Sequence, residues 1–159
     1  MAVIAPISFP IGIIPISCAT LIIYLISIVF KVKYSLFILL IYIFLGIIGL
    51  PVFSSYTGGI GIILGPTGGY IIGYIFMSLI ISLLIPKIKN KIYMYPLILL
   101  IGTIVLYIIG IIWLKIINDY TLKYAILVGV VPFIISDILK ISIATLIGYR
   151  INKLYINIS

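Results

Sequence analysis

The chain has 159 residues, of which 65% are hydrophobic and only 8% are charged. Soluble domains average about 25% charged residues, so this chain lacks the polar side chains that a water-facing surface needs, and its main solvent must be lipid. It contains no His and one Cys, Cys18, which excludes a disulfide or a Cys/His metal site within these residues. The net charge of +8 does not indicate nucleic-acid binding, because the basic residues stand singly or in small groups at the ends of apolar runs.

The first element in chain order, residues 1–13, is apolar but short. Pro6 and Pro10 rule out a regular helix through it. No charge precedes Lys31, so the element is not a secretory signal peptide with a basic start. We interpret it as the end of a first helix followed by an extended segment, so the first helix is expected to be short or truncated.

Five apolar runs follow, each near the roughly 20 residues that a helix needs to cross a bilayer. They cover residues 15–30, 34–50, 68–85, 92–114 and 124–150. Together with the N-terminal element, they predict an all-α integral membrane bundle of six transmembrane helices. We expect this bundle to be a single domain over residues 1–159.

The basic residues predict the orientation of the bundle. Seven of them fall in connections on one side or after the last run: Lys31, Lys33, Lys87, Lys89, Lys91, Arg150 and Lys153. On the other side only Lys115 and Lys123 flank a loop. Because Lys and Arg concentrate on the cytoplasmic side of membrane proteins, we expect a cell-membrane protein whose C-terminus is cytoplasmic.

The stretch GLPVFSSYTGGIGIILGPTGGYIIGY, residues 49–74, interrupts the apolar runs with glycine and proline but contains no charge. Backbone outside a helix survives at membrane depth only where protein or a water-lined cavity satisfies its polar groups. We therefore expect a loop between the third and fourth helices that covers an outward-facing site. A flexible external loop, or small residues that let helices pack closely, would explain this composition equally well.

Several residues of this stretch are candidates for ligand contacts. Glycines permit backbone angles closed to other residues and let a ligand approach closely, whereas tyrosines offer aromatic faces with a polar tip. The candidates are Tyr56, Gly58, Gly69 and Tyr70. Thr67 is placed to cap the fourth helix, whose free N–H groups would point at the cavity.

The second unusual stretch is VVPFIISDILKISIATLIG, residues 130–148, which contains Asp137 and Lys140. They are the only oppositely charged pair within an apolar run, and at three residues apart they share a helix face. A charge at the centre of a membrane helix costs about 2.5 to 3.5 kcal/mol on insertion scales. A structural ion pair is one explanation, but such a pair adds little net stability after desolvation. A ligand with N–H groups for Asp137 and a carboxylate for Lys140 would use both.

These blocks resemble the BioY family, the biotin-binding membrane subunits of energy-coupling factor (ECF) vitamin transporters. The family motif G-L-P-V-F, then glycines, then L-G-P-T-G-G-Y is similar to residues 49–70, and PFIISDILK is similar to its P-F-x-x-x-D-x-x-K block. IPISCATL resembles the family's P-I-T-L-Q-T segment more loosely. The three blocks agree in order and spacing, and the resemblance covers nearly the whole chain.

The resemblance implies a substrate-binding (S) component that captures biotin with high affinity for uptake, and not an enzyme. Biotin is then the transported substrate, and no cofactor is implied. Asp137 would accept hydrogen bonds from the ureido N–H groups, and Lys140 would meet the valerate carboxylate. Thr57, Gly69 and Tyr70 would line the cavity. The resemblance also implies the partners, a coupling transmembrane protein and two cytosolic ATPases. The chain itself has no G-x-x-x-x-G-K-[ST] nucleotide-binding loop, so it is not expected to hydrolyse ATP by that route.

The chain departs from the family pattern in three places. Ile71 stands where some members carry an Arg after G-G-Y, so Lys140 would carry more of the carboxylate binding. Ala19 stands where the family has Gln, which removes a polar partner for the ligand. Only the end of the family's longer first helix is visible, which bears on docking to the coupling protein more than on ligand binding.

Three alternatives stay open on the sequence. The chain could be an S component for a different vitamin. It could be a membrane interaction protein with no small-molecule ligand, in which case the core is filled and the Asp137–Lys140 pair is inert. An intramembrane enzyme is disfavoured, because the sequence offers no His and no second intramembrane carboxylate for acid–base or metal chemistry.

Overall fold

The N-terminal segment of the chain forms turns and two short strands. The computed structural model describes residues 1–9, 14–88 and 91–156, so Pro10 and Lys89 lie outside the described residues. The Ala5 amide donates to the Met1 carbonyl in a turn, and β1 (Ser8–Phe9) then pairs antiparallel with β2 (Ile16–Ser17). The predicted end of a first helix is therefore a turn followed by a strand, which agrees with the helix-breaking effect of Pro6.

Two short antiparallel helices come next, α1 (Ala19–Val29) and α2 (Val32–Ile47). The connection between them is extended at Phe30 and Lys31. α2 ends in a Schellman-type turn, in which the Leu50 amide donates to the Leu45 carbonyl and Gly49 adopts a φ of 101°. This left-handed conformation favours glycine and stops the helix at the start of the glycine-rich stretch.

The glycine-rich stretch is more ordered than the loop that the sequence predicts. It contains the 3₁₀ turn η1 (Ser54–Tyr56) and the one-turn helix α3 (Ile60–Leu64). Ile62 and Ile63 are half-buried against the core, whereas Ile60 and Leu64 are 61% and 62% exposed. Two of the four long aliphatic side chains of this segment therefore pack against the protein, and the other two lie on its surface.

The centre of the bundle is the antiparallel pair of α4 (Gly68–Leu84) and α5 (Tyr95–Ile117). The 3₁₀ segments η2 (Ile85–Ile88) and η3 (Ile92–Met94) lie between them along the chain. Small residues bring the two helices together, since a Cβ added at Gly73 would press on Leu106 and one at Gly102 would press on Ile81. Met77 and Leu99 are fully buried in this interface.

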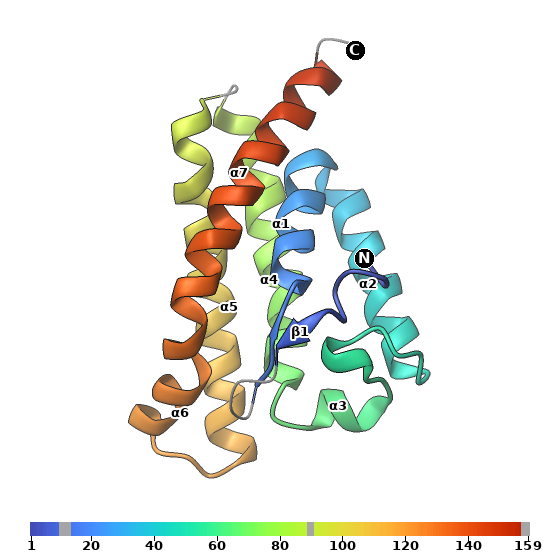
Figure 1. Cartoon of the computed structure of the whole chain (residues 1–159), viewed down its shortest axis with the longest axis vertical. Helices are drawn as coiled ribbons and strands as arrows, with labels where there is room; N and C mark the ends of the chain where they lie inside the picture. The colour runs from blue at the N-terminus through green and yellow to red at the C-terminus, as the bar shows by residue number, and fades with distance from the viewer. Residues whose placement is uncertain (10–13, 89–90, 157–159) are drawn as a thin grey trace.

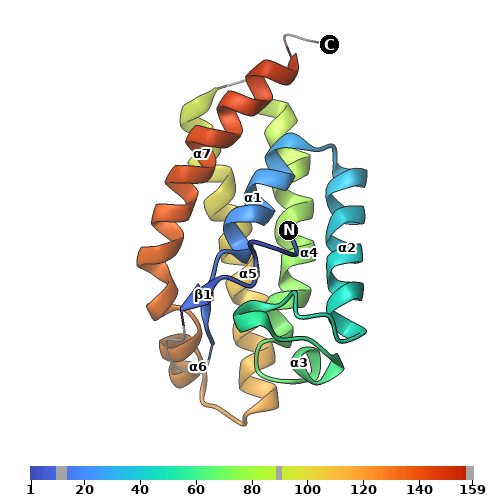
Figure 2. The same cartoon turned by 45° about the vertical axis from the view of Figure 1, so that its right-hand side comes forward.

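The last predicted span is broken into two helices, α6 (Leu122–Gly129) and α7 (Ile134–Ile156). The 3₁₀ turn η4 (Val131–Phe133), which contains Pro132, separates them, as expected for a proline that cannot donate a helical hydrogen bond. α7 packs along α1. Figure 2 shows α7 and α2 on opposite sides of the bundle, with α1, α4 and α5 between them.

The helices have the length and composition of a multi-pass membrane protein. Among the described residues, three segments are long and apolar enough to span a bilayer: Gly68–Ile88, Ile92–Ile117 and Leu122–Leu154. α1 and α2 are apolar but shorter, with 11 and 16 residues. The all-α prediction is confirmed, apart from the two-residue strands.

The two ends of the bundle differ in composition. Figure 1 shows the α1–α2 connection, the α4–α5 connection and the C-terminal end of α7 toward one end. The described basic residues in these segments are Lys31, Lys33, Lys87, Lys91, Arg150 and Lys153. The strands, α3 and the α5–α6 connection lie toward the other end. We call these the basic end and the glycine-rich end.

Candidate functional site

A cavity of about 210 Å³ lies toward the glycine-rich end, between α1, α4, α5, α7 and the segment from Phe53 to Thr67. One buried water needs roughly 10 to 15 Å³ by a comparable measure, so this space can hold a small organic molecule. It is lined by Ile14, Pro15, Ser17, Thr20, Tyr42, Phe53, Ser54, Ser55, Thr57, Ile62, Thr67, Tyr70, Ile71, Tyr74, Leu106, Tyr107, Phe133, Asp137 and Lys140. The walls are thus mostly apolar and aromatic with a few polar groups, which is typical of a small-molecule site.

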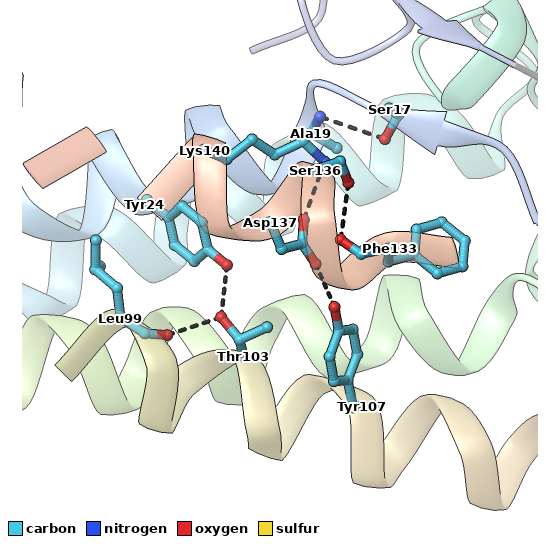
Figure 3. Close-up of polar contacts among 10 residues, drawn as sticks. All are labelled: Ser17, Ala19, Tyr24, Leu99, Thr103, Tyr107, Phe133, Ser136, Asp137 and Lys140. Atoms are coloured by element: carbon cyan, nitrogen blue, oxygen red, sulfur yellow. Dashed lines mark hydrogen bonds and ion pairs between the residues drawn. The ribbon is translucent and has the colours of Figure 1, made fainter. Parts of the chain in front are cut away.

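The two charged residues of α7 lie at the wall of this cavity. Lys140 Nζ donates to Asp137 Oδ1 at 3.1 Å, and the two side chains are 12% and 6% exposed. The other carboxylate oxygen, Oδ2, accepts a 2.6 Å hydrogen bond from the Tyr107 hydroxyl of α5 (Figure 3). Each carboxylate oxygen therefore has one donor, and α5 and α7 are joined across the cavity wall.

Tyr107 was not among the site residues predicted from the sequence. It is one of 13 tyrosines, and nothing in its immediate neighbours distinguishes it from the rest of the apolar run. Its spacing of four residues from Thr103 puts the two hydroxyls on one helix face, but this spacing does not point to Asp137. Thr103 donates to the Leu99 carbonyl and is also bonded to the Tyr24 hydroxyl, which forms a second polar layer next to the Asp137 cluster (Figure 3).

Polar groups of the β2–α1 segment form another part of the wall. Ser17 Oγ accepts from the Ala19 amide at 3.3 Å. Thr20 Oγ1 is buried and has no hydrogen-bond partner in the described part of the chain, although Thr20 lines the cavity. An unsatisfied buried hydroxyl costs about 1 to 3 kcal/mol, so it favours a ligand that supplies the missing partner. Thr20 was not among the residues predicted from the sequence, though it belongs to the IPISCATL block.

The structure places four of the predicted site residues at the cavity: Asp137, Lys140, Thr57 and Tyr70. The Tyr70 hydroxyl donates to the Gly129 carbonyl at 2.8 Å, which fixes its ring 6.4 Å from the ring of Phe133, with the two planes tilted by 35°. Thr57 Oγ1 donates to the Ser54 carbonyl at 2.8 Å and holds the turn around η1. Their role in ligand binding stays a prediction.

The other three predicted residues are not among those that line the cavity. Gly69 faces α5, where an added Cβ would overlap Trp113, so it serves helix packing. Gly58 also serves packing, because a Cβ added there would overlap the backbone of Leu50. Tyr56 is 63% exposed and adopts a φ of 56°. The geometry does not support their predicted ligand contacts, because the two glycines pack against other parts of the protein and Tyr56 is exposed at the surface.

The predicted capping role of Thr67 is also wrong. Thr67 occupies the N-cap position of α4, but its hydroxyl accepts no hydrogen bond from the helix. Instead, Thr67 Oγ1 donates to the Ile62 carbonyl at 3.2 Å and ties α3 to the start of α4. The amides at the start of α4 are partly satisfied by backbone, since the Gly68 amide donates to the Gly65 carbonyl.

Of the two residues that depart from the family pattern, Ile71 and Ala19, only Ile71 lines the cavity. Ile71 lines it with an aliphatic side chain. Lys140 is the only cation among the described residues that line the cavity, so any anionic group of a ligand there must use it or neutral donors. Ala19 is 1% exposed and is not among the lining residues.

An apolar helical bundle that encloses a partly polar cavity has the architecture of a membrane solute-binding subunit. Comparison with known proteins assigns the family: the model of the BioY family matches residues 1–157. The chain belongs to the BioY family.

The relatives cover most of the chain. It is 35% identical over 148 residues to "Biotin transporter BioY2" of Lactococcus lactis subsp. cremoris, with 93% of this chain and 81% of the relative covered. It is also 35% identical over 150 residues to "Biotin transporter BioY" of Thermotoga maritima, with 93% and 86% covered. A crystal structure described as the S-component for biotin from an ECF-type ABC transporter matches with a TM-score of 0.85 and 29% identity, over 92% of this chain and 80% of that one. The prediction of a BioY-family transport component rather than an enzyme is confirmed.

Proposed function

We propose that this chain captures biotin at the outer face of the cytoplasmic membrane, as the substrate-specific S component of an ECF-type transporter. One observation carries the proposal: a buried carboxylate, Asp137, lies at the wall of a small-molecule-sized cavity in a chain whose relatives are named biotin transporters. A protein with no small-molecule ligand would be expected to fill this space with side chains.

The chemistry of the cavity fits the two ends of biotin. The ureido ring carries two N–H donors and a carbonyl, and a carboxylate ends the valerate chain. We propose that Asp137 accepts the ureido N–H groups, since a carboxylate forms strong charge-assisted hydrogen bonds. Because Tyr107 and Lys140 already hold this carboxylate, it is oriented before the ligand arrives. The aromatic rings of Tyr70 and Phe133 supply apolar surface for the bicyclic body.

We assign the valerate carboxylate to Lys140, with neutral donors at the mouth of the cavity. The support is that Lys140 is the sole cation among the described lining residues. Its ammonium would have to leave Asp137 Oδ1, 3.1 Å away, and the incoming ureido N–H would take its place on that oxygen. Thr57 and Tyr70 also line the cavity, and we propose that both contact the ligand.

The proposed orientation places the C-terminus in the cytoplasm and the cavity toward the outside. The support is the concentration of Lys and Arg at the basic end, opposite the cavity (Figure 1). The predicted count of six transmembrane helices stays a prediction. The described residues include five apolar helices of 11 to 23 residues, and a turn and a strand stand in place of the first element.

The proposed partners are a coupling transmembrane protein and two cytosolic ATPase subunits. The support is the match to the S-component of an ECF-type transporter and the lack of a nucleotide-binding loop in the sequence. Transport would then draw its energy from the partners, and this chain would supply substrate recognition.

Equilibrium binding of biotin to the purified chain in detergent tests the proposal, with desthiobiotin and thiamine as competitors. We expect tight binding of biotin, competition by desthiobiotin because it keeps the ureido group, and none by thiamine. Preference for thiamine would make the chain an S component for a different vitamin. No binding by a chain that melts cooperatively would sink the proposal and leave a membrane interaction protein as the better account.

A further inference from the structure

A second concave surface lies at the basic end of the bundle, away from the ligand cavity. It is a groove between η3 and the C-terminal part of α7, which we call the α7 groove. Its lining residues are Ile92, Leu146, Tyr149, Arg150, Lys153 and Leu154. Five of these six belong to α7 at spacings of three and four residues, so they form one continuous face of that helix.

The wall of the α7 groove is held in place by buried contacts. The Tyr149 ring packs edge-on against Tyr95, with centroids 5.7 Å apart and planes at 87°. Tyr95 is fully buried, and its hydroxyl accepts a 2.9 Å hydrogen bond from Asn152 Nδ2. Because Tyr95 belongs to α5 and Asn152 to α7, these contacts fix the position of α7 relative to the start of α5. The groove is therefore a formed feature of the fold.

The groove combines uncompensated positive charge with apolar surface. Arg150 and Lys153 are both exposed, and neither forms a salt bridge in the described part of the chain. The only side-chain carboxylates in the sequence, Asp119 and Asp137, lie respectively in the α5–α6 connection and in the first turn of α7. Beside the two cations, Leu146 and Leu154 are 59% and 62% exposed. A ligand that matches this surface has an anionic head and an aliphatic body.

We propose that the α7 groove binds one anionic phospholipid of the cytoplasmic leaflet. Its phosphate lies between Arg150, whose guanidinium can bind it through two parallel hydrogen bonds, and the ammonium of Lys153. One acyl chain follows Leu146 along the helix toward the centre of the membrane. Tyr149 lies at headgroup depth, where aromatic side chains with a polar tip are favoured.

A lipid explains the surface better than a soluble anion does. Three of the six lining side chains are aliphatic, and a free phosphate would leave them without a partner. At the cytoplasmic surface of a bilayer, basic pockets between helices attract anionic headgroups, and each cation near the surface contributes about 1 kcal/mol. Removing both cations should therefore weaken binding roughly 30-fold, at a factor of ten for each 1.4 kcal/mol.

The test compares two double variants that remove the same charge from the same end of the protein. Arg150→Gln/Lys153→Gln alters the groove, whereas Lys31→Gln/Lys33→Gln alters two exposed positions outside it, in the α1–α2 connection and in the first turn of α2. Each purified full-length chain in a neutral detergent is titrated with phosphatidylglycerol, phosphatidylcholine or glycerol phosphate. The melting temperature is measured at each concentration. The melting temperature without lipid shows whether each variant is folded.

Phosphatidylglycerol should raise the melting temperature of the unaltered chain and of Lys31→Gln/Lys33→Gln at low concentration. The groove variant should need roughly 30-fold more of it. Equal effects in both variants, or no preference over phosphatidylcholine, would overturn the proposal. Glycerol phosphate acting as well as the lipid would make the groove a soluble-anion site. If the groove double variant is unfolded in the absence of lipid, the single variant Lys153→Gln tests the proposal instead, and it should weaken phosphatidylglycerol binding about fivefold.

Discussion

Two of the polar regions inside this mostly apolar bundle differ in how their polar atoms are satisfied. The first is the cavity wall with Asp137, Lys140, Tyr107 and Thr20. The second, which we call the hydroxyl seam, comprises Tyr24, Ser27, Ser78, Ser82 and Thr103. In the seam, Ser27 Oγ donates to Ser78 Oγ at 2.8 Å and Ser82 Oγ donates to the Ser78 carbonyl at 2.6 Å. At the cavity wall, Thr20 Oγ1 has no partner in the described residues.

This difference separates polar groups that hold helices together from polar groups that serve a ligand. The seam joins α1 to α4 through Ser27 and Ser78, and α1 to α5 through Tyr24 and Thr103. Its members are buried and mutually paired, so it offers nothing to a ligand. The cavity carries a charge pair and an unpaired hydroxyl at a surface that a small molecule can reach. Substitutions in the cavity should therefore change affinity, and substitutions in the seam should change stability.

Asp137→Asn should have the largest effect. It removes the charge from hydrogen bonds that contribute about 1.5 to 3 kcal/mol each, so biotin affinity should fall well over tenfold. Isothermal titration calorimetry on the purified variant measures this. Because the substitution leaves Lys140 without its partner, Asp137→Asn/Lys140→Gln is the control that removes both charges together. Unchanged affinity in a folded Asp137→Asn chain would remove Asp137 from the site.

Lys140→Ala should follow, with a loss of about tenfold or more for biotin and a smaller loss for biotin amide. The amide lacks the carboxylate that we assign to Lys140, so its affinity depends less on the ammonium. Competition binding with both ligands gives the ratio of the two losses. Equal losses would place Lys140 at the ureido end, beside Asp137 Oδ1, to which its ammonium donates.

The charge pair could be found from the sequence, but its hydroxyl partner could not. A charge in an apolar run is conspicuous, because lipid makes it costly wherever it lies. Tyr107 is chemically unremarkable in a chain with 13 tyrosines, and its importance depends on α5 packing beside α7. The same holds for Thr20, whose lack of a partner follows from the surroundings of the β2–α1 turn.

Tyr107 shows a site residue that the sequence hides, whereas the glycines show residues that look like site residues and serve packing instead. A cluster of glycines suits both a ligand-contacting loop and close helix packing, and the sequence cannot choose between them. Gly69 belongs to packing, because its neighbour Trp113 comes from a helix far along the chain. The break before α7 was predictable from Pro132, whose effect is local, whereas the β1–β2 pairing joins residues across a segment with no strand pattern.

Thr20→Val should lower biotin affinity about two- to tenfold while leaving the melting temperature of the empty chain unchanged or higher. The loss follows if a ligand supplies the partner that Thr20 Oγ1 lacks, since a neutral hydrogen bond contributes about 0.5 to 1.5 kcal/mol. Thr145→Val is a matched control, because Thr145 Oγ1 is also buried without a partner among the described residues but does not line the cavity. A lower melting temperature with unchanged affinity for Thr20→Val would place Thr20 with the hydroxyl seam.

Ser78→Ala should have the smallest effect and the opposite pattern. It removes the acceptor of the Ser27 hydroxyl in the middle of the bundle, and interhelical hydrogen bonds of this kind contribute about 0.6 kcal/mol on average in membrane proteins. The free energy of unfolding in mixed micelles should fall by about that amount, and biotin affinity should not change. Ser27→Ala/Ser78→Ala should lose little more than the single variant, because it removes both partners of one bond. A fall in affinity for Ser78→Ala would show that the seam and the cavity are coupled through α1 and α4, and the division between holding helices and binding ligand would then fail.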